Sequence, residues 1–298
     1  MPPRRAALPL GQAKPVLERL YRQFDRVESA ADPIHLVRRY ADPVDQEVAG
    51  FCAAALAFGR VASVVASIEA LLRIMGPSPA RFVRHFEPTR PGRSLTSFRH
   101  RWTGGDDLVM LFVILRRMID SDGSIEGFFL RGYRSDADDV GSALDSFCAR
   151  ALDLVDPARS PGVRYFFPKP AAGSACKRLN LYLRWMVRRD RIDFGVWRRV
   201  ATSKLVVPLD THVMRVGQCL RLTRYRSPGW PMAREITATL RQLEPDDPVK
   251  YDFSLCHLGM QDLCGFNRPQ RDVRCPLRGL CRPGGRRPEG SRRPSGRR

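Results

Sequence analysis

Lys177 is the first residue whose type and setting could do covalent chemistry. It lies in "GSACKRLNLYLRWMVRRD" (residues 173–190), where a serine precedes strong helix formers. This pattern predicts a helix with Ser174 as its N-cap and Lys177 in its first turn. The positive end of the helix dipole disfavours a second positive charge there, and a neutral amine can attack a carbon electrophile to form a Schiff base. The alternative is a solvated lysine that binds phosphate.

Asp210 is the second such residue, and it ends the apolar run of "VVPLDTHVMRV" (residues 206–216). Pro208 disfavours helix at the residue before it, so Asp210 or Thr211 can cap a helix that begins just afterwards. A carboxylate fixed at such a place can stabilise a developing cation or assist a proton transfer. The alternative is a purely structural cap, with His212 as a hydrogen-bonding group of the scaffold.

The elements that must position these two residues are predicted to be helices. Apolar side chains recur at helical spacing over residues 45–75, with a break at 59–60 and a stop at 76–79, and again over 108–119 and 141–154. The only run suited to a strand is the short "LVV" at 205–207. The sequence therefore predicts an all-α fold.

The charge of the chain indicates its partner. The 298 residues include 51 Lys and Arg against 31 Asp and Glu, a formal net charge of +20. Such an imbalance favours nucleic acid first and an anionic membrane surface second, although a GC-rich genome, which raises the arginine content of its proteins, could also produce it. Neither apolar stretch, at 48–59 and 108–115, reaches the length of about 20 residues that a membrane span needs. The start of the chain also lacks the apolar core of a signal peptide. We therefore expect a cytoplasmic protein that does not bind a membrane.

The two motifs together resemble a known superfamily. "G-x-A-x-K" ending at Lys177, followed by "P-L-D-T-H-V-x-R-V" around Asp210, is similar to the helix-hairpin-helix DNA glycosylases, which include endonuclease III and the 8-oxoguanine glycosylases. The resemblance implies that Lys177 is the nucleophile and Asp210 the catalytic aspartate. Thirty-two residues separate them, which is similar to the archaeal 8-oxoguanine glycosylases. Longer stretches between Tyr40 and Cys281 resemble an uncharacterised bacterial and archaeal family within this superfamily.

The resemblance also implies a fold and a DNA-contacting surface. The expected fold is a two-lobed helical domain with a central cleft and a C-terminal cysteine loop, bound to DNA as a monomer near the nucleoid. The hairpin before the lysine departs from the family pattern, because it lacks the usual leading Leu-Pro and second glycine. The residues expected to contact DNA are Gly173, Ser174, Arg178, Arg184, Arg188, His212 and Arg215.

Four of the eight cysteines gather near the C-terminus. "CPLRGLC", from Cys275 to Cys281, has the C-x5-C spacing that ends the iron–sulfur loop of endonuclease III-like enzymes, and Cys264 lies upstream. The resemblance implies a [4Fe–4S] cluster on these three thiolates. A cluster ordinarily takes four thiolates, and Asp272 stands where another cysteine is expected, so either Asp272 or Cys256 is the candidate fourth ligand. The remaining cysteines, Cys52, Cys148, Cys176 and Cys219, are predicted to be core residues.

These observations predict three segments and one function. Residues 1–30 form an N-terminal arm or helix, 31–281 the glycosylase-like domain, and 282–298 an arginine-rich tail without apolar side chains, which we expect to be disordered. The expected activity is removal of damaged bases from DNA, with oxidised purines as a candidate class, and strand cleavage through a lysine Schiff base. One alternative is a non-catalytic DNA- or RNA-binding protein on the same scaffold. Another is an enzyme that acts on modified nucleotides outside duplex DNA.

Overall fold

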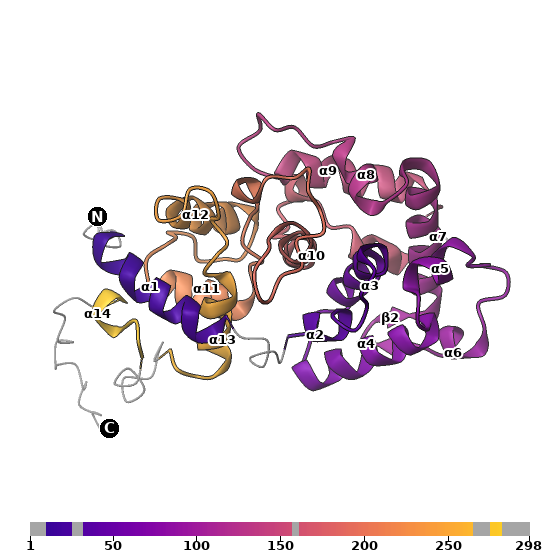
Figure 1. Ribbon diagram of the computed structural model, residues 1–298, viewed down its shortest axis with the longest axis horizontal. Helices are drawn as coiled ribbons and strands as arrows, with labels where there is room; N and C mark the ends of the chain where they lie inside the picture. The colour runs from indigo at the N-terminus through magenta and orange to yellow at the C-terminus, as the bar shows by residue number, and fades with distance from the viewer. Residues whose placement is uncertain (1–9, 26–31, 157–160, 265–274, 282–298) are drawn as a thin grey trace, which may run out of the picture.

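The computed structural model describes residues 10–25, 32–156, 161–264 and 275–281, and helices dominate these ranges (Figure 1). The mainly α fold predicted from the sequence is confirmed. Within the described ranges, no helix is both long enough and apolar enough to cross a membrane. The elements are α1 (Leu10–Phe24), α2 (Ile34–Val37), α3 (Pro43–Ala55), α4 (Val61–Met75), α5 (Pro79–Arg84), α6 (Arg93–Thr96), β1 (Arg99–His100), β2 (Thr103–Gly104), α7 (Gly105–Asp122), α8 (Ile125–Leu130), α9 (Gly141–Asp153), η2 (Pro161–Phe166), η3 (Pro170–Ala172), α10 (Lys177–Val187), η4 (Thr202–Lys204), α11 (Thr211–Cys219), α12 (Trp230–Arg241), α13 (Asp252–Met260) and α14 (Arg278–Cys281).

The long helices begin and end where their local chemistry requires. Helix α3 starts at Pro43 behind Asp42, whose side chain accepts a hydrogen bond from the backbone N–H of Val44. Helix α4 ends before Gly76, which has a φ of 73°, a conformation that glycine adopts without strain. The break and the stop predicted within residues 45–79 therefore match α3, α4 and the start of α5.

Two local expectations differ from the structure. The prolines and glycines of the segment 88–105 predict a connecting loop, but the segment contains α6 and an antiparallel hairpin in which Arg99 pairs with Gly104 and His100 with Thr103. Two-residue strands are too short to leave an alternating pattern in the sequence. The "LVV" run at 205–207 was expected to be a strand. It is buried but is not part of a strand, and it lies between η4 and α11.

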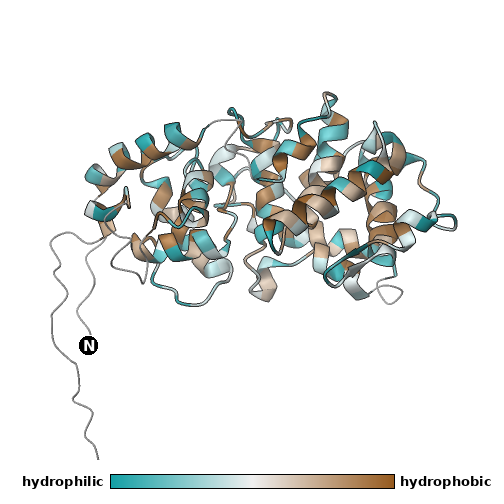
Figure 2. Ribbon diagram, turned by 90° about the horizontal axis from the view of Figure 1, so that it is seen from below, coloured by the Kyte–Doolittle hydropathy of each residue, from teal (hydrophilic) through white to brown (hydrophobic). Residues whose placement is uncertain are grey.

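Close helix contacts hold the centre of the molecule together. Helix α10 packs on α3, and a Cβ added at Gly50 would lie 2.9 Å from the Met186 side chain. Helix α11 packs on α13 in the same way, since a Cβ at Gly259 would lie 2.7 Å from that of His212. Brown, apolar residues line the helix faces that meet other helices in Figure 2, while teal residues lie mostly on the outside. Helix α3 thus meets α10 from the middle of the chain, and α11 meets α13 within the last third.

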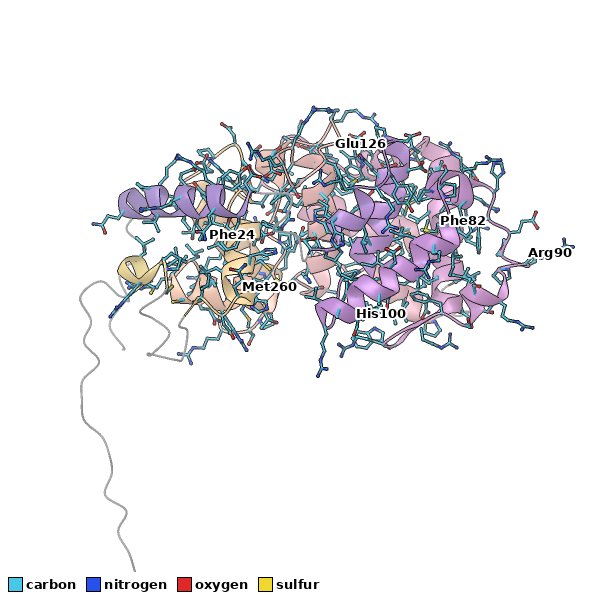
Figure 3. The ribbon with its side chains drawn as sticks, turned by 60° about the horizontal axis from the view of Figure 1, so that its bottom comes forward. Phe24, Phe82, Arg90, His100, Glu126 and Met260 are labelled. Atoms are coloured by element: carbon cyan, nitrogen blue, oxygen red, sulfur yellow. The ribbon has the colours of Figure 1, made fainter. Side chains whose placement is uncertain are left out.

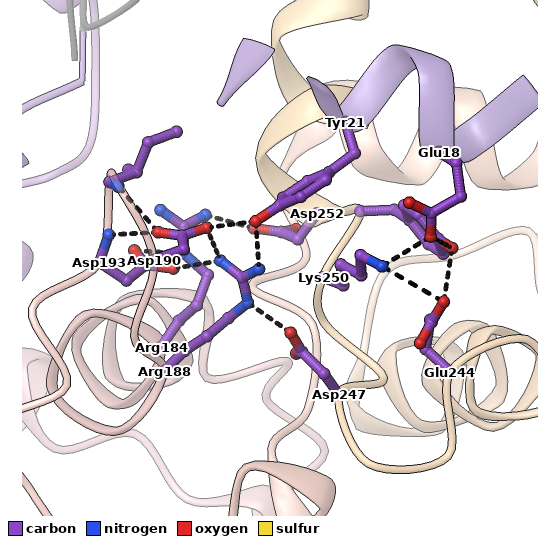
Figure 4. A network of polar contacts seen from close by, with 12 residues as sticks. Glu18, Tyr21, Arg184, Arg188, Asp190, Asp193, Glu244, Asp247, Lys250 and Asp252 are labelled. Atoms are coloured by element: carbon purple, nitrogen blue, oxygen red, sulfur yellow. Dashed lines mark hydrogen bonds and ion pairs between the residues drawn. The ribbon is translucent and has the colours of Figure 1, made fainter. Parts of the chain in front are cut away.

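Helix α1 is part of this packing. It packs on α13, which lies near the other end of the chain in sequence (Figure 1). Lys14 donates to the carbonyl of Leu243 at 2.9 Å, and Glu18 accepts from Lys250 and from the Tyr251 hydroxyl, each at 2.6 Å (Figure 4). The helix in the predicted arm therefore completes the C-terminal group of helices.

Candidate functional site: the Lys177–Asp210 cavity

Lys177 and Asp210 line the same cavity, although 32 residues separate them in the sequence. The cavity has a volume of about 160 Å³. Its walls come from the loop after α3, the start of α4, helix α10, the residues that open α11, and one face of α13, from which Met260 contributes at the position labelled in Figure 3. The lining residues are Asp32, Pro33, Ala57, Gly59, Val61, Val64, Lys177, Leu181, Arg184, Pro208, Asp210, His212, Asp252, Phe253, Cys256, His257 and Met260.

The backbone before α10 aims Lys177 into the cavity. Helix α10 begins at Lys177 itself, and Cys176 takes the N-cap position with a φ of 48°, in the left-handed region. Ser174 is therefore not the N-cap that the sequence predicted. Its hydroxyl accepts from the backbone N–H of Cys176 at 3.2 Å and so stabilises the turn before the helix. The Lys177 Nζ donates to the carbonyl of Ala57 at 3.0 Å, across from α10.

Asp210 has two partners, one for each carboxylate oxygen. It is the N-cap of α11, with Oδ1 accepting from the backbone N–H of Val213 at 2.7 Å. The thiol of Cys256, on α13, donates to Oδ2 at 3.1 Å. Burial, and then the negative charge of Asp210, raises the pKa of Cys256, so it remains a thiol that can donate. The carboxylate is therefore held at the edge of the cavity by both its own helix and α13.

Asp210→Ser distinguishes the helix-capping role of Asp210 from the role of its negative charge. We expect Asp210→Ser to keep the Val213 hydrogen bond and the stability of the protein, because serine caps helices about as well as aspartate. Asp210→Ala should instead lose about 1 kcal/mol of unfolding free energy, as expected for a lost cap. Urea denaturation of the two variants measures this difference. Equal stability losses would show that the carboxylate, and not the cap, stabilises this region.

The structure corrects the sequence interpretation of Arg184 and Arg188, which we expected to contact DNA. Their exposed fractions are only 2% and 5%. Arg184 binds Asp193 at 3.2 Å and Asp252 at 2.6 Å, and Arg188 binds Asp193 at 3.0 Å. In Figure 4 these side chains form one buried network, which also includes Tyr21, Asp190 and Asp247. Both arginines hold helices together, so their guanidinium groups are not available to a phosphate backbone.

Arg178 was also expected to contact DNA, but its guanidinium group is buried and binds backbone carbonyls. It is 9% exposed and donates to the carbonyls of Ala55, at 2.8 Å, and Tyr165. Burial lowers the pKa of its guanidinium to about 10. The guanidinium carbon lies 3.9 Å from the centre of the Tyr165 ring and 5.1 Å from that of Phe58. Arg178 thus supports a group of aromatic rings at the surface.

This group, which we call the aromatic patch, consists of Phe58, Trp102 and Tyr165. The Phe58 and Trp102 rings are stacked with centroids 4.8 Å apart, and Tyr165 meets Trp102 edge-on at 5.0 Å. Trp102, at the turn of the β1–β2 hairpin, is 55% exposed and Tyr165 is 38% exposed. Phe58 directly follows Ala57, the residue that accepts from Lys177. The sequence did not predict a role for Trp102, because no local pattern shows that its ring stacks on Phe58.

The other residues expected to contact DNA lie at or near the surface. Gly173 and Arg215 are exposed, and Ser174 and His212 are partly exposed. Gly173 has a φ of 81°, and its carbonyl accepts from the backbone N–H of Trp230 at 3.2 Å. His212 lines the cavity beside Asp210. Contact of these four residues with DNA stays a prediction.

The cysteines are arranged differently from the expected ligand set. Cys256 lies in the cavity beside Asp210, and Asp272 lies outside the described residues. Cys219, which the sequence assigned to the core, forms side-chain hydrogen bonds with Cys264 and Cys281, and these contacts raise its pKa. Among the described residues, no three or more His, Cys, Asp or Glu side chains are placed to hold a metal ion. The [4Fe–4S] cluster stays a prediction, and we derive no step through one.

The comparisons with known proteins identify the family. Residues 32–261 match the family of proteins of unknown function named DUF2400. The chain belongs to this family. The match spans α2 to α13 of this DUF2400 protein and includes every residue that lines the cavity. No curated protein and no solved structure matches the chain significantly.

Proposed function

We propose that this DUF2400 protein is a DNA base-excision glycosylase with a lysine nucleophile and a two-lobed, glycosylase-like fold around a central cleft. The observation that carries the proposal is that one amine and one carboxylate, from distant parts of the chain, line one cavity. The amine is at the start of α10 and the carboxylate caps α11. This pairing suits a reaction in which a nucleophile attacks carbon while positive charge develops beside a carboxylate.

The chemistry would proceed at the C1′ carbon of a nucleotide turned out of the helix. The lone pair of the Lys177 Nζ forms a bond to C1′ as the bond from C1′ to the base breaks, and the base leaves with the electron pair of that bond. The C1′–O4′ bond then breaks, a proton passes from Nζ to O4′, and a Schiff base forms between Nζ and C1′. Loss of a proton from C2′ expels the 3′ phosphate and cuts the strand. The Asp210 carboxylate stabilises the positive charge that develops on the sugar.

Two further features support DNA as the partner. The net charge of +20 favours a polyanion, and a phosphate backbone is the most common one in a cell. The aromatic patch offers flat, exposed rings close to Lys177, on which an unstacked base could lie. Arg101 adds a cation there, with its guanidinium carbon 5.2 Å from the centre of the Trp102 ring. The damaged base is thus expected to enter the cavity from the side of this patch.

Borohydride trapping tests the proposal. The protein is mixed with duplexes that carry abasic sites or a panel of oxidised, deaminated and alkylated bases, and sodium borohydride reduces any Schiff base to a stable bond. We expect a covalent protein–DNA adduct on at least one member of the panel. Binding of DNA without an adduct on any lesion would favour the alternative of a non-catalytic nucleic-acid-binding protein on this scaffold. Adducts with free modified nucleotides but not with DNA would favour the other alternative.

Trp102 is expected to contribute to DNA affinity. Base–aromatic stacking is worth about 1–3 kcal/mol per base, so Trp102→Ala should weaken binding to a duplex with an abasic site by about tenfold. Fluorescence anisotropy with a labelled duplex measures this change. Tyr225→Ala is the matched control, because Tyr225 has an exposed ring, at 38%, but lies outside the patch and the cavity. Equal losses for both variants would show that the patch has no special role.

A further inference from the structure

A groove of about 780 Å³ lies on the surface between α4, α6 and the β1–β2 hairpin, elements that lie together in Figure 1. Three exposed arginines line it: Arg73 on α4, Arg93 on α6 and Arg99 on β1. Among the residues that the structure describes, no aspartate or glutamate lines this groove. We call it the arginine groove, and its lining carries three positive charges and no negative one.

The fold does not neutralise these three charges. Within the described part of the chain, none of the three guanidinium groups forms an ion pair with a carboxylate. Glu69, one helical turn before Arg73, pairs with a different arginine. The Arg99 Nη1 donates to the backbone carbonyls of Thr96, at 3.2 Å, and Phe98, at 2.7 Å. These neutral acceptors hold the guanidinium at the groove and leave its charge for a ligand.

The arginine groove is linked to the aromatic patch through one histidine. The His100 Nδ1 lies 2.8 Å from the hydroxyl of Ser67, which lines the groove, and its Nε2 lies 3.0 Å from the carbonyl of Phe58, in the patch. Phe58 follows Ala57, which accepts from Lys177. A polymer that reaches the cavity across the patch can therefore continue into the groove.

We propose that the arginine groove holds the phosphate backbone of the DNA strand beside the base that enters the cavity. The proposal rests on the function proposed above and adds a second contact surface to it. A guanidinium group binds a phosphate through two parallel hydrogen bonds, and the exposed hydroxyl of Ser94 adds a further donor. Residues 66–74 of α4 line the groove over about 12 Å, which covers about three phosphates of one strand. Three arginines match that number.

The salt dependence of DNA binding tests the proposal. The groove variant combines Arg73→Gln, Arg93→Gln and Arg99→Gln. Each phosphate contact contributes about 0.9 to the slope of log K against log salt, so we expect the slope to become shallower by about 2–3. Fluorescence anisotropy at several salt concentrations measures it, with a labelled duplex that carries a tetrahydrofuran abasic analogue. This analogue cannot form a Schiff base, so the lysine chemistry does not affect the result.

A control variant removes the same number of charges elsewhere. It combines Arg19→Gln, Arg22→Gln and Arg198→Gln, three exposed arginines that lie outside the groove and the cavity. The first two are on α1, at the other end of the molecule from α4 and α6 in Figure 1. We expect the slope of this variant to stay within about 0.5 of wild type. Equal changes in both variants would show that only the net charge matters and would overturn the proposal.

Two further variants separate charge from local structure. Lysine at positions 73, 93 and 99 keeps the three charges, and lysine also binds phosphate, so the slope should stay within about 0.5 of wild type. The double variant Arg73→Gln with Arg93→Gln leaves the hydrogen bonds of Arg99 intact and should make the slope shallower by about 2. A lysine variant as impaired as the glutamine variant would indicate a disturbed hairpin and would overturn the proposal.

Vesicles of phosphatidylserine and phosphatidylcholine test a membrane surface as the other polyanion. We expect the groove variant and the control variant to bind these vesicles equally. Vesicle binding that is lost only in the groove variant, together with an unchanged DNA slope, would assign the groove to a lipid surface and overturn the proposal.

The outcomes also separate this inference from the proposed function. Borohydride adducts together with an unchanged slope in the groove variant would overturn the groove and leave the glycosylase intact. A slope that becomes shallower only in the groove variant, without an adduct on any lesion, would support the groove and overturn the lysine chemistry. An unchanged slope without any adduct would overturn both.

Discussion

Replacing Lys177 with alanine is expected to abolish the borohydride adduct and to lower strand cleavage at a lesion by about a thousandfold or more, as expected when a nucleophile is removed. The amine is the only group of this residue that can form a Schiff base, and its hydrogen bond to Ala57 holds it at the cavity. Single-turnover cleavage and gel analysis of the reduced adduct measure the two effects. Affinity for an uncleavable duplex should stay within about threefold of wild type, because one surface charge contributes little to binding.

Lys204→Ala is the matched control for this prediction. Lys204 also donates from a partly buried position to a backbone carbonyl, that of Ala137 at 2.7 Å, but it does not line the Lys177–Asp210 cavity. We expect this variant to trap DNA as well as wild type does. An adduct that persists in Lys177→Ala would contradict the role of this lysine and point to another amine as the nucleophile.

Replacing Arg188 with alanine is expected to lower the unfolding free energy by about 3–5 kcal/mol, the usual cost of breaking a buried ion pair from one side. The change leaves Asp190, Asp193 and Asp247 with fewer partners in a buried setting. Burial already raises the pKa of Asp193 to about 6 against the opposing effect of Arg184 and Arg188, so loss of one arginine makes its charge still less favourable. Urea denaturation followed by circular dichroism measures the loss.

Arg39→Ala provides the comparison at the surface. Arg39 and Glu69 form an ion pair at 2.5 Å, but their side chains are 39% and 33% exposed. An exposed pair of this kind contributes about 0–1 kcal/mol, and we expect a loss in that range. If Arg188→Ala proved no more harmful than Arg39→Ala, the buried network would not stabilise the fold, and our reassignment of Arg188 would be wrong.

The features that the sequence predicted well are those with local causes. The break between α3 and α4 and the end of α4 at Gly76 follow from glycine and proline residues whose effects reach only a few positions. The helix after Asp210 follows in the same way, from a proline and a capping side chain. These patterns are readable because helix periodicity and capping depend on side chains within one or two turns.

The errors concern side chains whose partners are distant in the sequence. Arg184 and Arg188 were expected to contact DNA, but Asp252 and Asp247, more than 55 residues away in the sequence, bind their guanidinium groups in a buried network. Cys219 reads as an ordinary core residue, and only the folding of the chain brings Cys264 and Cys281 to it. A local pattern does not show which face a distant segment will cover.

By itself, the sequence determined that the chain is mainly helical, strongly basic, and equipped with a lysine and an aspartate at the starts of two helices. Only the tertiary structure decided that these two residues share one cavity, that two of the nearby arginines are buried in ion pairs, and that the exposed Trp102 stacks on Phe58. The physical reason is that helix formation depends on neighbours along the chain, whereas a cavity and its charges depend on which helices pack together.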